Sequence, residues 1–229
     1  AGINILWRDN NSSSKGVADR VEYQDFLTPR NNPICDPECR DIGMLSGLDE
    51  YISKQKKDDI IIVLHQMGSH GPAYYERVPE SFQKFKPFCK TNQLDQCTKE
   101  EISNAYDNTI LYTDFFLSEV IDFLKKYDDR FETAMFYVSD HGESLGEHNM
   151  YLHGMPYFIA PKGVTSVPLI LWFGKNLIKS ESLDMDLLKL KSNKPISHDN
   201  VFHTLLGILE IETGIYKKEK DLQSFAIKK

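Results

Sequence analysis

The chain has 229 residues, of which 41% are hydrophobic and 11% aromatic, and this composition argues against disorder and suffices for one sizeable α/β domain. A formal net charge of −7 argues against nucleic-acid binding, because phosphate backbones are bound by basic patches and the lysines here are interleaved with acids. No apolar segment approaches the roughly 20 residues that span a bilayer. The sequence lacks an initiator methionine and a secretory signal, so we expect Ala1 to be an internal boundary.

A strand and a polar loop are expected first. Residues 4–8 form an apolar run that predicts a strand. A stretch rich in turn-forming residues follows and carries Asn11, Ser12 and Lys15. By itself this stretch is typical of a solvated turn.

The next segment predicts an irregular region, a helix and a second strand. Residues 20–40 contain three prolines and should be irregular. From Asp41 onward, apolar residues recur at three- and four-residue steps, which predicts a helix with one buried face that ends in the lysine-rich residues 54–57. Residues 60–66 are a continuous β-branched run, as expected for a parallel strand covered on both faces.

The two pairs of cysteines predict disulfides. Cys35 lies close to Cys39, and Cys89 lies close to Cys97. Pairing neighbours would close two small loops, as in proteins of an oxidising, extracytoplasmic compartment. A four-cysteine zinc site is the alternative, although these spacings lack the tight ligand pairs of such sites. Neither pair is a CxxC, which argues against a redox role.

A long helix should begin at a capping box. The hydroxyl of Thr98 can accept from the amide of Glu101, while Glu101 reaches back to the amide of Thr98. A helical stripe of apolar residues then continues to about Tyr127.

Fewer elements are expected in the last third. Residues 167–173 predict another buried strand, and residues 180–194 are polar and lysine-rich. A helix should follow Ser197, whose residue type suits a helix cap, and the charged tail after Gly214 should be peripheral.

Residues 134–154 combine an apolar strand with a loop that is rich in acidic residues and histidines. Five of the seven histidines lie either in this loop or at and just beyond the carboxyl end of the strand predicted at 60–66. Ligands of open α/β sheets bind at the carboxyl ends of the strands, so we expect the two segments to meet there. The residues concerned are His65, His70, Asp140, His141, Glu143, His148 and His153.

The first interpretation of this loop is a metal site. Asp140 and His141 offer an oxygen and a nitrogen ligand of the types that zinc accepts, and Gly142 gives the backbone freedom to turn. A divalent cation there would polarise a phosphoryl or sulfuryl oxygen, while imidazoles would stabilise the transferring anion.

The second interpretation is a serine hydrolase. Residues 142–146 formally match GxSxG after a strand, with Ser144 as the nucleophile. A nucleophile elbow requires a helix after the serine, and no helical stripe follows. Asp140 and His141 also precede the serine, whereas the hydrolase order places the acid and the histidine after it. The metal interpretation is therefore favoured over both the hydrolase and a plain polar turn.

Four blocks of the sequence, in the same order, resemble the phosphoethanolamine transferases, the group within the alkaline phosphatase and sulfatase superfamily that decorates lipid A and confers polymyxin resistance. The blocks are LWRDNNSSSKG, LHQMGSHGPAYYERVP, SDHGESLGEHNMYLHGMPYFIAPKGVTSVPLILW and ISHDNVFHTLLGIL. The resemblance implies a three-layer α/β/α sandwich with a mostly parallel, mixed central sheet, and residues 1–229 as one catalytic domain.

The resemblance also implies a role for individual residues. Asp140 and His141 would bind zinc, and a second zinc could be held near His70 and His153. His65 would stand nearby, with Glu143 as a supporting partner of the site. Residues of the first loop would face the substrate: Lys15 near its phosphate, Asn11 and Ser12 near the ethanolamine head. The Cys89–Cys97 pair resembles a family disulfide.

The implied reaction moves phosphoethanolamine from phosphatidylethanolamine to lipid A, another glycan or a protein, at the periplasmic face of the bacterial inner membrane. Members of the family use a threonine nucleophile and a zinc-binding glutamate from blocks upstream of this sequence, and they carry N-terminal membrane helices. We therefore expect this polypeptide to be inactive alone and to depend on that upstream segment. Family cysteines are replaced here by Ser14 and Ala18.

Three rival functions share some of these features. A sulfatase or a phosphoglycerol transferase of the same superfamily would have the same Asp-His pair, and the upstream nucleophile block would distinguish them. A serine hydrolase would be labelled at Ser144 by a fluorophosphonate. A non-catalytic binding domain would keep its cellular function when Asp140 is replaced by Asn.

Overall fold

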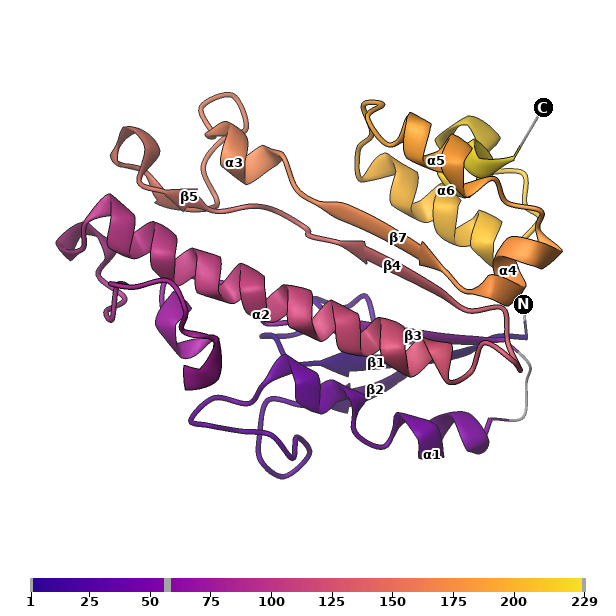
Figure 1. Cartoon of the computed structure of the whole chain (residues 1–229), viewed down its shortest axis with the longest axis horizontal. Helices are drawn as coiled ribbons and strands as arrows, with labels where there is room; N and C mark the ends of the chain where they lie inside the picture. The colour runs from indigo at the N-terminus through magenta and orange to yellow at the C-terminus, as the bar shows by residue number, and fades with distance from the viewer. Residues whose placement is uncertain (1, 56–58, 228–229) are drawn as a thin grey trace. The chain divides into compact units, whose positions relative to one another are not determined.

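The computed structural model describes residues 2–55 and 59–227, and its architecture is α/β, as predicted (Figure 1). The chain divides into two compact units, which are considered separately. The β1–β3 unit comprises Gly2–Val120 and His141–Ser166, and the β4–β7 unit comprises Ile121–Asp140 and Val167–Lys229. That residues 1–229 form one catalytic domain stays a prediction.

A three-stranded parallel sheet underlies the β1–β3 unit. Its strands, in the order β2-β1-β3, are β1 (Asn4–Asp9), β2 (Glu22–Asp25) and β3 (Ile60–His65). The predicted strands β1 and β3 are confirmed, and their register ends with Asp9 opposite His65. The expectation that residues 20–40 are irregular is wrong at β2, because four mostly polar residues pair with β1 at the edge of the sheet.

The helix predicted from Asp41 is interrupted. A 3₁₀ helix, η1 (Asp41–Leu45), is followed by α1 (Leu48–Ser53). Gly47 stands between them with φ at +72°, a left-handed conformation that ends one helix and begins the next. The predicted buried face is seen only in part, since Leu48 is almost inaccessible but Ile42, Leu45, Tyr51 and Ile52 are half-buried. Residues 56 and 57 of the predicted helix end lie outside the described residues.

The long helix α2 (Lys99–Lys125) begins at the predicted capping box. Thr98 N donates to Glu101 Oε2 over 2.8 Å, and Glu101 N donates to Thr98 Oγ1 over 3.2 Å. The helix continues nearly as far as its apolar stripe predicts.

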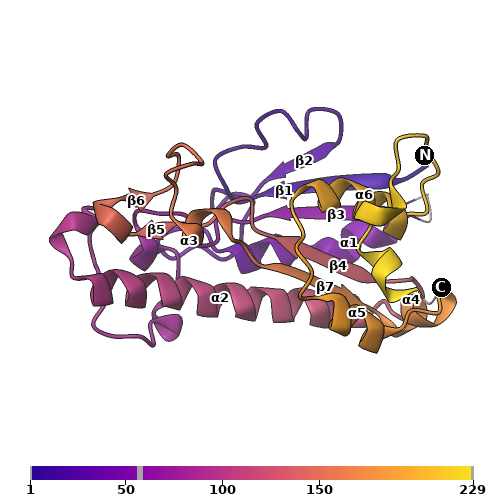
Figure 2. The ribbon, with the colours of Figure 1, turned by 90° about the horizontal axis from the view of Figure 1, so that it is seen from above.

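A hairpin and a disulfide loop pack around the start of α2. Strands β5 (Ser144–Leu145) and β6 (Tyr151–Leu152) form the hairpin, which contributes to the same apolar cluster as Ile102 and Ala105 of α2 (Figure 2). Both predicted disulfides, Cys35–Cys39 and Cys89–Cys97, are confirmed. The remaining short helices of this unit are η2 (Tyr74–Glu76), η3 (Glu80–Phe82), η4 (Leu94–Gln96), η5 (Glu147–Asn149) and α3 (Lys162–Thr165).

The β4–β7 unit pairs strand β4 (Ala134–Val138) antiparallel with β7 (Leu169–Phe173), both of them predicted strands. Helices α4, α5 and α6 accompany them (Figure 1), and the buried apolar cluster of the unit includes Phe173, Leu177 and Leu183. The helical elements are α4 (Lys175–Ser180), α5 (Met185–Lys191), α6 (Asp199–Ile208), η6 (Lys218–Lys220) and η7 (Gln223–Ala226).

Three features of this unit differ from the sequence analysis. The polar stretch after residue 180 holds helix α5, capped by Asp184, whose carboxylate accepts from Leu187 N over 2.9 Å. The tail is not wholly peripheral, because Ala226 is fully buried. At the start of α6, Ser197 Oγ accepts from Asp199 N over 3.3 Å, although the cap position itself is occupied by His198. Among the described residues, no helix combines the length and the apolar character needed to cross a bilayer.

Asn108, buried on α2, ties the loop after η3 to the helix. Its Oδ1 accepts from Lys84 N over 2.8 Å and from Phe85 N over 2.9 Å, and its Nδ2 donates to Phe85 O over 3.1 Å. We expect Asn108→Ala to lower the free energy of unfolding by about 1–3 kcal/mol, because these amides lose their acceptor. Urea unfolding measures this. Asn104→Ala, which removes one exposed hydrogen bond to Pro87 O, should cost less, and equal costs would contradict the tie.

Candidate metal centre

Asp9, at the end of β1, holds the adjacent end of β3. Its fully buried side chain lies 3.1 Å, Oδ2 to Nδ1, from His65, the last residue of β3. The same carboxylate accepts from Trp7 Nε1 over 3.2 Å and from Asn11 N over 2.8 Å. Asp9 was not predicted as a site residue, although it directly follows the predicted strand at residues 4–8.

Asp41 anchors the loop that leads from β3 to His70. Its buried carboxylate accepts from Met67 N and Gly68 N, each over 2.9 Å, and from Asn10 Nδ2 over 2.8 Å. Burial raises the pKa of Asp41, and these hydrogen bonds act in the opposite direction. Asp41 therefore fixes this loop, at the free-energy cost of burying a carboxylate. The helical periodicity predicted from Asp41 onward gave no indication of this role.

Glu143 joins the loop after β3 to the loop after β4. Its Oε1 accepts from Gly71 N over 3.3 Å and lies 3.1 Å from His153 Nδ1. The carboxylate is almost inaccessible, and its Oε2 has no hydrogen-bond partner within the described part of the chain. One potential ligand atom from each of His141, Glu143 and His153 lies within 4.8 Å of the others.

The three histidines of this region present the same ring nitrogen. His70 Nδ1 lies 2.8 Å from Gly71 O, and His141 Nδ1 lies 3.0 Å from Gly142 O. A carbonyl oxygen can only accept, so in each neutral ring Nδ1 carries the hydrogen and Nε2 the lone pair. His153 Nδ1 faces the carboxylate of Glu143 with the same result. The ring of His153 lies 3.9 Å from that of His141 and 5.5 Å from that of His70, centroid to centroid.

Gly142 is required by close packing, whereas the sequence analysis attributed it to turning freedom. A Cβ atom at this position would lie 1.9 Å from Gly163 O. The close approach lets Gly142 N donate to Val164 O over 2.8 Å. This contact fixes the backbone between His141 and Glu143.

The donor set of this cluster fits a metal ion. Two imidazole nitrogens and a carboxylate are ligands that zinc accepts, and each donor has a second interaction of the kind that orients metal ligands. The buried Glu143 Oε2, unpaired within the described residues, is the type of atom that a cation would satisfy. Asp140 is the last residue of the β4–β7 unit segment, and its role as a ligand stays a prediction.

The predicted substrate-binding residues lie on the loop after β1. Asn11 Nδ2 donates to Gln66 O over 3.1 Å, which ties this loop to the end of β3. Ser12 N donates to Asn11 Oδ1 over 2.6 Å. Lys15 is exposed and has a left-handed backbone, with φ at +50°. The contacts of these three residues with substrate stay predictions.

Ser144 is poorly placed to be a nucleophile. It is fully buried in β5, and its hydroxyl lies 2.7 Å from Glu147 Oε2 and 2.7 Å from Met150 O. The element that follows is the 3₁₀ helix η5, not the helix of a nucleophile elbow. The geometry therefore argues against the serine hydrolase.

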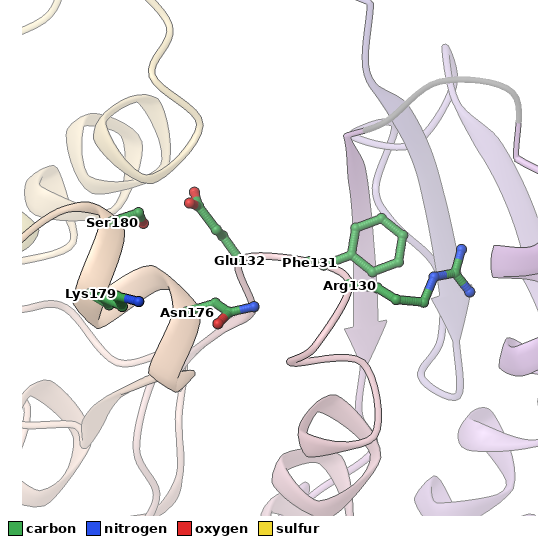
Figure 3. Close-up of a pocket in the computed structure, with 6 residues that line it drawn as sticks. All are labelled: Arg130, Phe131, Glu132, Asn176, Lys179 and Ser180. Carbon is green, nitrogen blue, oxygen red and sulfur yellow. The ribbon is translucent and has the colours of Figure 1, made fainter.

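A concavity in the β4–β7 unit carries, among the described residues, no cluster of ligand groups comparable to that of His141, Glu143 and His153. Its lining comes from the segment after α2 and from α4 (Figure 3). Arg130 and Phe131 point away from Asn176 and Lys179, so the polar groups do not converge on a common point. Convergent polar groups are what distinguishes a binding pocket.

The chain matches the sulfatase family over residues 1–211 and belongs to that family. Within it, the chain is similar to phosphoethanolamine transferases. It is 46% identical over 231 residues to the phosphatidylethanolamine transferase Mcr-2 of Escherichia coli, a match that covers 98% of this chain and 41% of that protein. The chain thus spans about two fifths of the length of this curated relative.

Two solved structures are similar in fold and sequence. One is the integral membrane protein lipooligosaccharide phosphoethanolamine transferase A of Neisseria meningitidis, with a TM-score of 0.92 and 43% identity over 99% of this chain and 42% of that one. The other is the C-terminal periplasmic domain of phosphoethanolamine transferase EptC of Campylobacter jejuni, with a TM-score of 0.84 and 44% identity over 97% of this chain and 67% of that one.

We expect Gly142→Ala to destabilise the loop after β4. The added Cβ would overlap Gly163 O, a backbone atom that cannot rotate away, so the free energy of unfolding should fall by about 1–3 kcal/mol. Urea unfolding checks this. Gly214→Ala is the matched control, because nothing lies within 4 Å of its added Cβ, and similar losses for both variants would contradict the packing argument.

Asp41 should make stability depend on pH. A raised folded pKa means that the folded state holds this proton more tightly than the unfolded chain, so the contribution of Asp41 is complete below the ordinary value of 3.8 and is lost as the pH rises through the folded pKa. We expect the stability of the wild type relative to Asp41→Asn, which does not titrate, to fall over that window. Urea unfolding at stepped pH measures it, and a difference that stays constant or rises would refute the raised pKa.

Proposed function

We propose that the whole protein is a zinc-dependent phosphoethanolamine transferase. It moves phosphoethanolamine from phosphatidylethanolamine to lipid A or another envelope acceptor, at the periplasmic face of the inner membrane. One observation carries the proposal: the buried carboxylate of Glu143 lies in the same group as His141 and His153, and the Nδ1 atoms of His70, His141 and His153 face carbonyl or carboxylate oxygens, which leaves Nε2 as the lone-pair nitrogen of each ring. The phosphoethanolamine transferases to which the chain is similar support the choice of reaction.

Each residue of the site has a proposed part in this reaction. Asp140 and His141 hold zinc, and Glu143 and His153 either complete the zinc coordination or support it. The site holds one zinc ion or two. When bound, zinc polarises a phosphoryl oxygen and lowers the pKa of the attacking hydroxyl. His70 and His153 balance negative charge on the phosphoryl group, and Lys15 neutralises the substrate phosphate. His65, whose Nδ1 faces Asp9, stands nearby.

The remaining proposed roles concern the ethanolamine head of the substrate and a segment upstream of residues 1–229. Asn11 and Ser12 face the ethanolamine head. The attacking hydroxyl is that of a threonine from the upstream segment, and the intermediate is a phosphothreonine. A membrane domain N-terminal to residues 1–229 would place the site beside its lipid donor, as the integral membrane relative suggests.

A sulfatase or phosphoglycerol transferase is the second candidate, since the chain belongs to the sulfatase family. The same histidines would suit a sulfuryl group. The two functions separate when the whole protein is purified and offered phosphatidylethanolamine, phosphatidylglycerol and an aryl sulfate. Transfer from phosphatidylethanolamine alone supports the proposal, and turnover of either other substrate in its place would overturn it.

His141→Asn should reduce both bound zinc and transfer. Removing one ligand lowers metal affinity by at least the 10- to 100-fold that loss of a supporting residue costs. Zinc retained after dialysis and product formed per enzyme measure the two effects. His148→Asn is the matched control, because His148 is exposed in the same loop outside the cluster, and Asn tolerates its left-handed backbone. If both variants keep their zinc and activity, His141 is not a ligand.

A further inference from the structure

The loop that follows His153 exposes three consecutive apolar side chains. We call residues 156–162 the aromatic loop. Within it Tyr157 is 83% exposed, Phe158 is 87% exposed and Ile159 is 48% exposed. Isolated exposed apolar residues are common on proteins, but a contiguous group that includes two aromatic rings marks a surface for another partner.

The aromatic loop is a formed turn. Ile159 N and Ala160 N both donate to Pro156 O, over 3.0 Å and 3.1 Å, and Val164 N donates to Pro161 O over 2.9 Å. Prolines at both ends restrict the backbone further. The rings are therefore held outward by their own turn, and little ordering entropy remains to be lost when a partner covers them.

Both ends of the aromatic loop are tied to the metal centre. It starts just after His153, whose Nδ1 lies 3.1 Å from Glu143. It is followed by Gly163 and Val164, and Val164 O accepts from Gly142 N over 2.8 Å. The aromatic loop is thus anchored at both ends to the segments that carry His141, Glu143 and His153.

The charge around the aromatic loop is unusual for this chain. The chain carries a net charge of −7, yet residues 148–180 contain no aspartate or glutamate. Along the sequence, the charged residue nearest to Tyr157 and Phe158 is Lys162, which is exposed. Aromatic rings beside a lysine, with no acid nearby, match the interface of a phospholipid bilayer, where rings lie at headgroup level and lysine meets phosphate.

We propose that the aromatic loop docks on the phospholipid bilayer, with Tyr157 and Phe158 at the boundary between headgroups and acyl chains and Lys162 at the phosphates. This inference rests on the proposed function, since a transferase that takes its donor from a bilayer must bring its cluster to the headgroup. It goes beyond that function by naming the surface that makes the approach.

Photocrosslinking identifies what covers the rings. The whole protein is reconstituted in phospholipid nanodiscs with benzoylphenylalanine at position 158, or at position 23 as control, since Tyr23 is also exposed but stands beside Glu22 on β2. After irradiation, mass spectrometry should find phospholipid adducts at 158 and few at 23. Adducts to a second copy or to another segment of the same protein, adducts equal at both positions, or no adduct at all would each overturn the proposal.

Kinetics then separate docking from chemistry. Replacing Tyr157 and Phe158 by Ser should lower kcat/KM for phosphatidylethanolamine in a bilayer by about tenfold, the factor for losing the burial of roughly one aromatic side chain. Turnover of a water-soluble, short-chain donor should stay unchanged. Equal loss on both donors would mean that the loop shapes the site and does not dock. If the wild type uses neither donor, the proposed function fails, and the crosslinking result still stands by itself.

Discussion

The geometry of the metal centre depends on one buried carboxylate, that of Glu143. Burying an ionised group costs free energy unless hydrogen bonds compensate, and Glu143 Oε1 meets both Gly71 N and His153 Nδ1. These two contacts join the loop after β3 to the hairpin after β4. Without Glu143, the ring of His153 would lose its fixed tautomer, and the two loops would lose their shared hydrogen-bond acceptor.

Two further buried acids repeat this arrangement on a smaller scale. Asp9 holds the end of β3 through His65, and Asp41 accepts two backbone amides of the loop that leads to His70. Asp41 thereby satisfies backbone amides that no regular element pairs, and Asp9 faces His65 across the paired ends of β1 and β3. Loops that carry catalytic groups are usually the more mobile parts of a fold, and here buried acids restrain them.

Hydrophobic patterning was enough to locate β1, β3, α2, β4 and β7, because apolar residues recur periodically or continuously along these segments. The capping box and the disulfides followed from local chemistry. Edge strand β2 and helix α5 escaped notice, because pairing with β1 and a cap at Asp184 stabilise segments without an apolar signature. The break at Gly47 was missed because the apolar spacing continues across it.

The same division applies within the site. Residue type and position after a strand indicated His70, His141, Glu143 and His153. The acids that support the site, Asp9 and Asp41, were missed because their partners are backbone amides or residues far along the chain, and such pairs leave no spacing in the sequence.

All three histidines of the cluster are followed by glycine, and the structure shows that these glycines serve different needs. At Gly71 and Gly142 a Cβ would collide with Leu152 Cδ2 at 2.4 Å and with Gly163 O at 1.9 Å, so glycine permits the close packing of a neighbouring segment. At Gly154 nothing lies within 4 Å and φ is +92°, so only there is turning freedom the reason. The carbonyl oxygens of the same two glycines lie 2.8 Å from His70 Nδ1 and 3.0 Å from His141 Nδ1. The orientation of these two rings is thus set by contacts within the chain before any ligand binds, which lowers the cost of organising the site around a metal or an anion.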